Sequence, residues 1–275
     1  MIDFTKKERY GYEDMVRVIH LLRAPGGCPW DREQTHQSIR RNFLEETYEV
    51  LEAIDEDDPV HLCEELGDVL TQVVFHGDME EEAGRFTLDD VYDGVCKKMI
   101  GRHPHVFGDV EVSSSGEVLD NWEVIKRQEK GQATYADTLR AVAKSLPANW
   151  RAEKLYKKAG KAGFRWEGPL EALEKVREEA GELERALRRE GDPTEELGDL
   201  LFAAVGVSFA MGADPEEVLQ AACEKFILRF SQMEALAAAE GEALDRLPRE
   251  RLLRLWAAAK DERDKSDYQE ERTTT

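Results

Sequence analysis

"EELGD" occurs twice in this chain, at residues 64–68 and again at residues 195–199. An acidic segment with apolar residues at helical spacing precedes each copy: "LEETYEVLEAI" at 44–54 and "VREEAGELERAL" at 176–187. Apolar residues three and four positions apart lie on one face of an α-helix. The sequence therefore predicts that the same two helices, joined by a short turn, occur twice in the protein.

The repetition extends beyond these helices and keeps the same order in both halves. "CKKMIGR" at 96–102 corresponds to "CEKFILR" at 223–229, and "NWEVIK" at 121–126 corresponds to "LWAAAK" at 255–260. Alternating strand patterns are scarce along the chain. We therefore expect an all-α fold made of two tandem, duplicated helical-bundle domains.

The two copies also set the expected domain bounds. Each copy ends with its Trp- and Lys-containing segment, which leaves a short stretch near Gly131 to join them, and the last residues are charged and polar. The expected parts are a first domain, a linker, a second domain and a polar tail, at residues 1–130, 131–137, 138–262 and 263–275.

Composition limits the range of partners. The chain has 59 acidic and 38 basic residues among 275, which leaves a formal net charge of −21. This balance argues against a broad basic surface for nucleic acid or for an anionic membrane. It does not exclude a phosphate ligand, because metal ions bridge carboxylates to phosphates.

The remaining sequence features favour a reduced, soluble, cytoplasmic protein. None of the four cysteines forms a C-x-x-C pair, and the N-terminal stretch lacks the apolar core of a signal peptide. The longest mostly apolar stretch, Leu200–Ala213, is too short to span a bilayer. We expect neither a membrane nor a nucleic acid as partner.

Four carboxylates of the first copy have mirrored spacing. Glu49 and Glu65 lie eight residues on either side of Asp57, and Glu46 and Asp68 lie eleven residues on either side. Both helices of a hairpin rise ~1.5 Å per residue, so equal distances from the turn bring residues level. The spacing therefore predicts that the four carboxylates face one another in two rungs.

The second copy has the same symmetry about Arg189. Facing carboxylates repel, which raises some of their pKa values unless a cation neutralises them, and an all-oxygen cluster favours Mg²⁺ or Mn²⁺. Solvated acidic helix faces are the alternative, but they do not explain eight acidic positions in register. The corresponding carboxylates of the second copy are Glu179, Glu182, Glu196 and Asp199.

Basic residues and tryptophans also recur in both copies at a spacing of four, which places each pair on one helix face. Cations beside a carboxylate-held metal suit a polyphosphate ligand, and a tryptophan there could stack on a base. Core packing of the tryptophans and ordinary salt bridges remain alternatives. The pairs are Lys98 with Arg102, Lys225 with Arg229, Trp122 with Lys126, and Trp256 with Lys260.

Nucleophilic side-chain chemistry is disfavoured. All six histidines lie in the first half, so a duplicated mechanism does not need one, and we interpret His103 and His105 as local structure. No GxxxxGK[ST] loop is present. Metal-activated water remains as the chemistry that both copies could share.

The acidic segments resemble the E-E-x-x-E … E-x-x-D signature of the MazG family of all-α nucleoside triphosphate pyrophosphohydrolases. "GGCPWDREQTHQS" at 26–38, "GRHPHVFGD" at 101–109 and "NWEVIK" are similar to further landmarks of its tandem-domain bacterial members. The resemblance covers nearly the whole chain. It implies Mg²⁺-dependent hydrolysis of nucleoside triphosphates between the α and β phosphates, to a monophosphate and pyrophosphate, in house-cleaning of the nucleotide pool. It also implies a homodimer.

The resemblance implies roles for individual residues as well. The eight carboxylates would bind Mg²⁺, and the basic pairs with their tryptophans would contact the nucleotide. Glu45 and Glu178 precede the two clusters and would orient the water or a second metal.

Two alternatives stay open. A four-helix metal carrier or di-iron protein needs Glu-x-x-His on two helices, and only Glu33 with His36 matches. A non-catalytic helical module that binds nucleotides or a protein is the other.

Nothing in the sequence indicates base preference. We expect the second copy to carry most activity, because the first inserts "GDVEVSSSGEVLD" at 108–120 and has histidines near its cluster.

Overall fold

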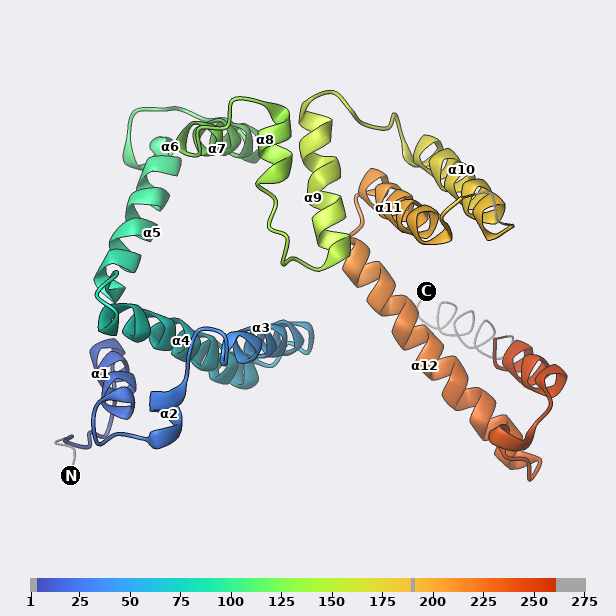
Figure 1. Ribbon diagram of the computed structural model, residues 1–275, viewed down its shortest axis with the longest axis horizontal. Helices are drawn as coiled ribbons and strands as arrows, with labels where there is room; N and C mark the ends of the chain where they lie inside the picture. The colour runs from blue at the N-terminus through green and yellow to red at the C-terminus, as the bar shows by residue number, and fades with distance from the viewer. Residues whose placement is uncertain (1–3, 189–190, 261–275) are drawn as a thin grey trace. The chain divides into compact units, whose positions relative to one another are not determined.

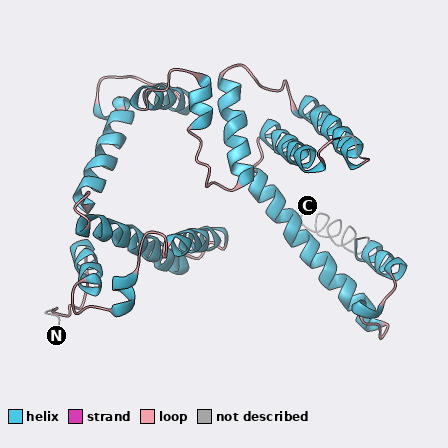
Figure 2. Cartoon of the chain, in the orientation of Figure 1, coloured by secondary structure: helices cyan, strands magenta, loops and turns pink. Residues whose placement is uncertain are grey.

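The computed structural model describes residues 4–188 and 191–260. Throughout these ranges the chain forms helices joined by loops and turns, without a β-strand (Figure 2). The prediction of an all-α fold is therefore confirmed. Arg189 and the expected polar tail at 263–275 lie outside the described residues.

The chain divides into two compact units, Met1–Lys126 and Arg127–Thr275. The stretch expected to be a linker belongs to the second unit, and helix α8 (Tyr135–Arg140) begins inside it. Thr134 caps this helix: its side chain accepts a hydrogen bond from the Asp137 backbone N–H, and the Asp137 side chain accepts one from Thr134. The capping box explains why a helix starts within an apparently loop-like segment.

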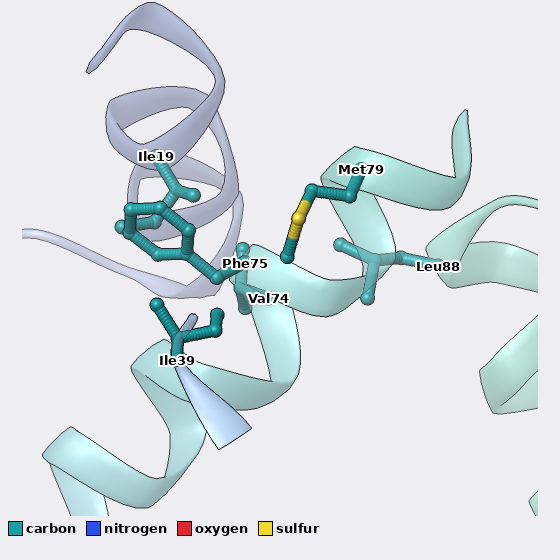
Figure 3. Packing of buried hydrophobic residues seen from close by; sticks show 6 residues of the cluster. All are labelled: Ile19, Ile39, Val74, Phe75, Met79 and Leu88. Carbon is teal, nitrogen blue, oxygen red and sulfur yellow. The ribbon is translucent and has the colours of Figure 1, made fainter. Parts of the chain in front are cut away.

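The first unit is organised around one long helix, α4. Figure 1 shows α1, α3 and α5 placed along it, and these helices pack directly on α4. Apolar side chains from them surround the C-terminal half of α4, where Val74, Phe75 and Met79 are buried (Figure 3). The helices are α1 (Tyr12–Arg23), α2 (Pro29–Glu33), α3 (Arg40–Asp55), α4 (Pro59–Glu82), α5 (Leu88–Arg102), α6 (Pro104–Phe107) and α7 (Ser115–Glu129), which crosses the boundary between the units.

The second unit has two small apolar clusters. Ala152, Tyr156 and Val205 are buried between α9 and α11. Met233 and Ala237 of α12 pack against a last helical segment at 249–260. The helices after α8 are α9 (Ala148–Lys161), α10 (Pro169–Leu187), α11 (Pro193–Met211), α12 (Pro215–Ala239) and the 3₁₀ turn η1 (Leu244–Arg246).

An aspartate N-cap followed by proline starts the second helix of each predicted hairpin. Asp58 accepts hydrogen bonds from the backbone N–H groups of the second and third residues of α4, and Pro59 takes the first position. Asp192 caps α11 with one such bond, from the Thr194 N–H, and Pro193 again takes the first position. An aspartate cap followed by proline satisfies the free N–H groups of a helix start and presets its dihedral angles.

All four cysteines are free thiols. Within residues 4–188 and 191–260, no single helix is both long and apolar enough to cross a bilayer. The pair α11 and α12 meets that test only when taken together, across a break that bends by 107°.

Candidate functional site

Helices α3 and α4 form an antiparallel hairpin that brings carboxylates of the first unit together. One oxygen from each of Glu46, Glu49 and Glu65 lies within 4.8 Å of the others. Asp68 is close enough for its charge to act on Glu46. The three glutamates therefore converge as the mirrored spacing predicts, and Asp68 lies near enough to add its charge.

The hairpin of α10 and α11 does the same in the second unit, with one addition. Oxygens of Glu179, Glu196 and Asp199 lie within 4.8 Å of one another, and so do those of Glu178, Glu179 and Glu182. Glu179 belongs to both groups and is only 5% exposed. It is therefore the centre of a five-carboxylate cluster.

The electrostatics of both clusters favour a bound cation. Burial raises the pKa of Glu46, and the charges of Asp68 and Glu49 raise it further. Burial also raises the pKa of Glu196, together with the charges of Glu182 and Asp199. A carboxyl group whose pKa is raised by folding destabilises the folded state when it ionises. At neutral pH, a cation that neutralises the repulsion between the carboxylates would therefore stabilise each cluster.

A buried, unpaired oxygen marks where such a cation fits in the first unit. Glu65 is 7% exposed, and within the described ranges its Oε2 atom is buried without a hydrogen-bond partner. Burial and the neighbouring Glu49 carboxyl raise the pKa of Glu65. A buried carboxylate oxygen without a donor is costly, and a metal ion would satisfy it.

The two clusters differ in the cationic side chain beside them, which the sequence reasoning missed. Lys175 Nζ lies 2.5 Å from Glu179 Oε1 and 3.0 Å from Glu178 Oε1, and these hydrogen bonds raise the pKa of Lys175. In the first unit, His61 Nε2 lies 3.3 Å from Glu65 Oε1. Both residues lie four positions before a carboxylate of the cluster. This spacing places them on the same helix face and could have predicted the two contacts.

Glu178 and Glu45 have different environments although their sequence positions match. Glu178 is part of the cluster in the second unit. The Glu45 side chain instead accepts a hydrogen bond of 2.7 Å from Arg41 Nε and is exposed. The structure thus brings only Glu178 to the carboxylates, because an arginine four residues earlier engages Glu45.

The basic and aromatic residues of the second unit lie on α12 and the segment 249–260. The Phe226 and Trp256 rings lie 5.2 Å apart, so the helix that carries Lys225 and Arg229 contacts the segment that carries Lys260. Arg229 Nε is buried and, in the part of the chain that the structure describes, has no hydrogen-bond partner. A buried donor without an acceptor is costly, and an anionic group that reached it would relieve this cost.

Corresponding residues of the first unit meet at the end of α5. The His103 ring lies edge to face with the Trp122 ring, 4.7 Å away, so Trp122 of α7 approaches the helix that carries Lys98 and Arg102. Trp122 Nε1 is buried and, within residues 4–188, has no hydrogen-bond partner. Lys126 follows one turn later on α7.

Within each unit, the helices that carry the basic residues lead away from the carboxylate hairpin (Figure 1). Leu88, the first residue of α5, packs at Gly77 of α4. Gly77 lies nine residues after Asp68, which is about 13 Å along the helix. Helix α12 leaves α11 after the bend of 107°. The sequence did not predict this separation.

Together, the fold and the site define a protein of two helical hairpins that each hold a carboxylate cluster suited to a hard cation. The family model described as MazG nucleotide pyrophosphohydrolase domain matches the chain twice, at residues 34–107 and 167–233. These ranges contain both hairpins. The chain belongs to the MazG family and is a nucleoside triphosphate pyrophosphohydrolase, a hydrolase that acts on acid anhydrides.

Similar proteins cover most of the chain. One from Thermotoga maritima, named nucleoside triphosphate pyrophosphohydrolase/pyrophosphatase MazG, is 43% identical over 249 residues, which is 90% of this chain and 95% of that protein. The nucleoside triphosphate pyrophosphohydrolase of Escherichia coli is 40% identical over 251 residues, with the same coverage of 90% and 95%. The uncharacterized protein YabN of Bacillus subtilis is 46% identical over 262 residues, 93% of this chain and 53% of that protein.

Proposed function

We propose that this protein hydrolyses nucleoside triphosphates between the α and β phosphates, with Mg²⁺ or Mn²⁺ held by the carboxylate clusters. The observation that carries the proposal is the buried position of Glu179 between two groups of carboxylates, Glu178 with Glu182 and Glu196 with Asp199. The three candidate metal groups in the described ranges consist of Glu and Asp alone. All-oxygen donors suit Mg²⁺ and Mn²⁺.

In the second unit, different residues would bind the metal, position the carboxylates and accept the proton. Glu179, Glu182, Glu196 and Asp199 would hold the metal, which supplies an activated water and polarises the phosphate oxygens. Lys175 donates to both Glu178 and Glu179 and thus keeps these two carboxylates side by side. Held in this way, Glu178 would accept a proton from the attacking water, since it is the exposed member of this pair of carboxylates.

A di-iron or metal-carrier function has less support. Glu33 and His36 form the only Glu-x-x-His match, and neither belongs to a candidate metal group. The His36 side chain is instead engaged by His76 and Glu80. We further propose that the protein acts in the cytoplasm, in house-cleaning of the nucleotide pool.

We propose that a second copy of the chain completes each site. The carboxylates and the basic residues lie apart within a unit, whereas a triphosphate needs both. The hairpins also carry exposed apolar side chains: Leu197 and Leu201 of α11 are 46% and 61% exposed. Exposed apolar side chains gathered on one element are typical of a protein–protein interface. On α3 and α4 the exposed apolar residues are Leu44, Tyr48, Leu51, Leu66 and Leu70.

Replacing Leu201 with Glu tests the homodimer. We expect the variant to shift from dimer to monomer in light scattering after gel filtration and to lose NTP hydrolysis, because burying an unpaired carboxylate in an interface is costly. Leu170→Glu is the matched control, since Leu170 is 80% exposed but lies at the start of α10, where an acidic residue is favourable. A dimer that survives Leu201→Glu would exclude this face as the interface.

Metal removal tests the chemistry itself. We expect chelation by EDTA to abolish activity and Mg²⁺ or Mn²⁺ to restore it, because the clusters repel without a cation. Chromatography of the products of an α-labelled triphosphate should show labelled monophosphate and an equal amount of pyrophosphate. Diphosphate with inorganic phosphate would contradict cleavage between the α and β phosphates, and restoration by iron alone would favour the di-iron alternative.

A further inference from the structure

Three titratable side chains form a line in the first unit, away from the carboxylate cluster. His36 belongs to the connection between α2 and α3, and His76 and Glu80 lie one turn apart on α4. His36 Nδ1 is 2.6 Å from His76 Nδ1, and His36 Nε2 is 2.6 Å from Glu80 Oε1. The proposed hydrolysis uses none of these groups.

The two imidazole rings meet edge to edge. Their planes differ by only 5°, and their centroids are 4.9 Å apart. The centroid separation is longer than the 2.6 Å between the two Nδ1 atoms by about the width of one ring. Such a difference arises when the Nδ1 atoms lie on the line between the two centroids. The rings therefore lie side by side in one plane and not face to face. The contact is therefore an in-plane N–H···N hydrogen bond, in which one nitrogen donates and the other accepts.

The partners of His36 determine the positions of the protons. His36 Nε2 lies 2.6 Å from Glu80 Oε1, a contact that lacks the geometry of a hydrogen bond. An anionic oxygen this close still favours a proton on Nε2. In the neutral state its Nδ1 atom then accepts, and His76 donates its Nδ1–H. One added proton can be accommodated, because a charged His36 carries a proton on both nitrogens while His76 accepts. A second proton would place two N–H groups against each other, which breaks the hydrogen bond.

Charged groups around the pair come from three elements. Glu80 accepts a hydrogen bond of 2.6 Å from Arg85 in the turn after α4, which weakens its ability to stabilise a second charge. On the neighbouring face of α4, His20 and Arg23 of α1 pair with Asp78. From α3, the Phe43 ring lies 5.9 Å from the His76 ring and provides no charge.

The hydrogen bond spans the point where α3 begins. Ile39, three residues after His36, is buried beside Val74 and Phe75 of α4 (Figure 3). Helix α3 starts at the next residue and carries Glu46 and Glu49 to their partners on α4. The position of His36 on His76 therefore influences how the two helices of the hairpin are held together.

We propose that His36 and His76 form a pH-sensitive latch that holds the start of α3 on α4 and opens when both imidazoles are protonated. Opening loosens the first-unit hairpin and with it the alignment of Glu46 and Glu49. The latch stands on the geometry of the histidines, and only its effect on metal binding rests on the proposed function.

The direction of the pH effect follows from linkage. Burial lowers the pKa of His76, and the charge of His36 lowers it further, while Glu80 opposes both. The unfolded chain, with an ordinary histidine pKa of about 6.5, then binds more protons than the folded one. Stability is complete above about pH 6.5 and is lost as the pH falls through the lowered pKa of His76.

Replacing His76 with Asn tests the latch, because an amide N–H can still donate to His36 Nδ1 but does not titrate. The measurement is hydrogen exchange of the amides of residues 43–50 in the full-length protein, between about pH 7.5 and pH 5.5, corrected for intrinsic rates. For one proton bound on opening, we expect opening to increase by up to tenfold per pH unit in the native chain. We expect His76→Asn to remove this increase and His105→Asn to retain it.

Imidazole ¹⁵N resonances of the same protein provide a second measurement that does not depend on activity. At about pH 7.5 we expect a proton on Nδ1 of His76 and on Nε2 of His36, followed by titration in two separate steps. Independent titration of both histidines, or the same exchange increase in His76→Asn, would overturn the latch. An inactive protein with both signatures intact would contradict the proposed hydrolysis and leave the latch standing.

Discussion

Glu182→Ala is expected to remove most NTP hydrolysis, by on the order of 100-fold or more in kcat/KM, the scale on which loss of a metal-site group acts. Glu182 shares a group with Glu178 and Glu179, and its charge acts on Glu196 across the hairpin. Without it the proposed metal site has one ligand fewer, and Arg185, which pairs with Glu182 at 3.1 Å, is left without this partner. A steady-state assay of pyrophosphate release measures the effect.

The matching change in the first unit, Glu49→Ala, should have a smaller effect on turnover. The first cluster lacks two features of the second. It has no counterpart of Glu178, because Glu45 pairs with Arg41, and it has no counterpart of Lys175, because the corresponding residue is Asn42. His61 lies against Glu65 instead. Glu49→Ala is therefore expected to act mainly through stability, because Glu49 lies against the buried Glu65 side chain.

Glu184→Ala is the control for this comparison. Glu184 lies on the same helix as Glu182 but pairs with Arg188 on the exposed side. All three variants should be matched for helical content and oligomer size before activity is compared. If Glu49→Ala abolished pyrophosphate release while Glu182→Ala left it intact, the principal site would have to be assigned to the first unit.

The largest effect on stability is expected for Gly27→Ala, in the turn between α1 and α2. A Cβ atom on Gly27 would lie 2.3 Å from the Leu22 carbonyl oxygen and 2.4 Å from that of Leu21. These are backbone atoms, and the Leu22 oxygen already accepts a hydrogen bond of 2.8 Å from the Cys28 N–H. The turn has to open, so we expect a loss of about 3 kcal/mol in the free energy of unfolding.

Gly94→Ala is the opposite case and a matched control. Gly94 lies inside α5 with open space around the position of a Cβ atom. Alanine there should stabilise the helix by up to ~1 kcal/mol, because glycine loses more conformational freedom on folding. Denaturant unfolding followed by circular dichroism compares the variants. A Gly27→Ala protein as stable as the native chain would mean that the turn does not need the close approach.

The spacing of charged and apolar residues in the sequence was enough to determine the two hairpins. A helix has a constant rise per residue, so residues equidistant from a turn become level once the two helices pack. Glu46 and Asp68 therefore converge as the spacing predicts, and Glu179 and Asp199 do the same in the second copy. Asp58 and Asp192 start the second helix by contacts within three residues, which are also legible in a sequence.

The direction of individual side chains was decided only in the folded chain. Glu45 and Glu178 hold matching positions, yet a nearby arginine engages one while Lys175 draws the other into the cluster. Such choices depend on which neighbour offers the better hydrogen bond, and helical periodicity does not encode them.

The periodicity of the sequence likewise did not predict contacts between segments that are far apart in the chain. His36 meets His76 across 40 residues, because the α2–α3 connection folds back onto α4. The separation of the basic residues from the carboxylates depends on where α5 and α12 leave their hairpins. Helix periodicity determines which face of a helix is buried, whereas the direction in which successive helices continue depends on packing between residues far apart in the chain.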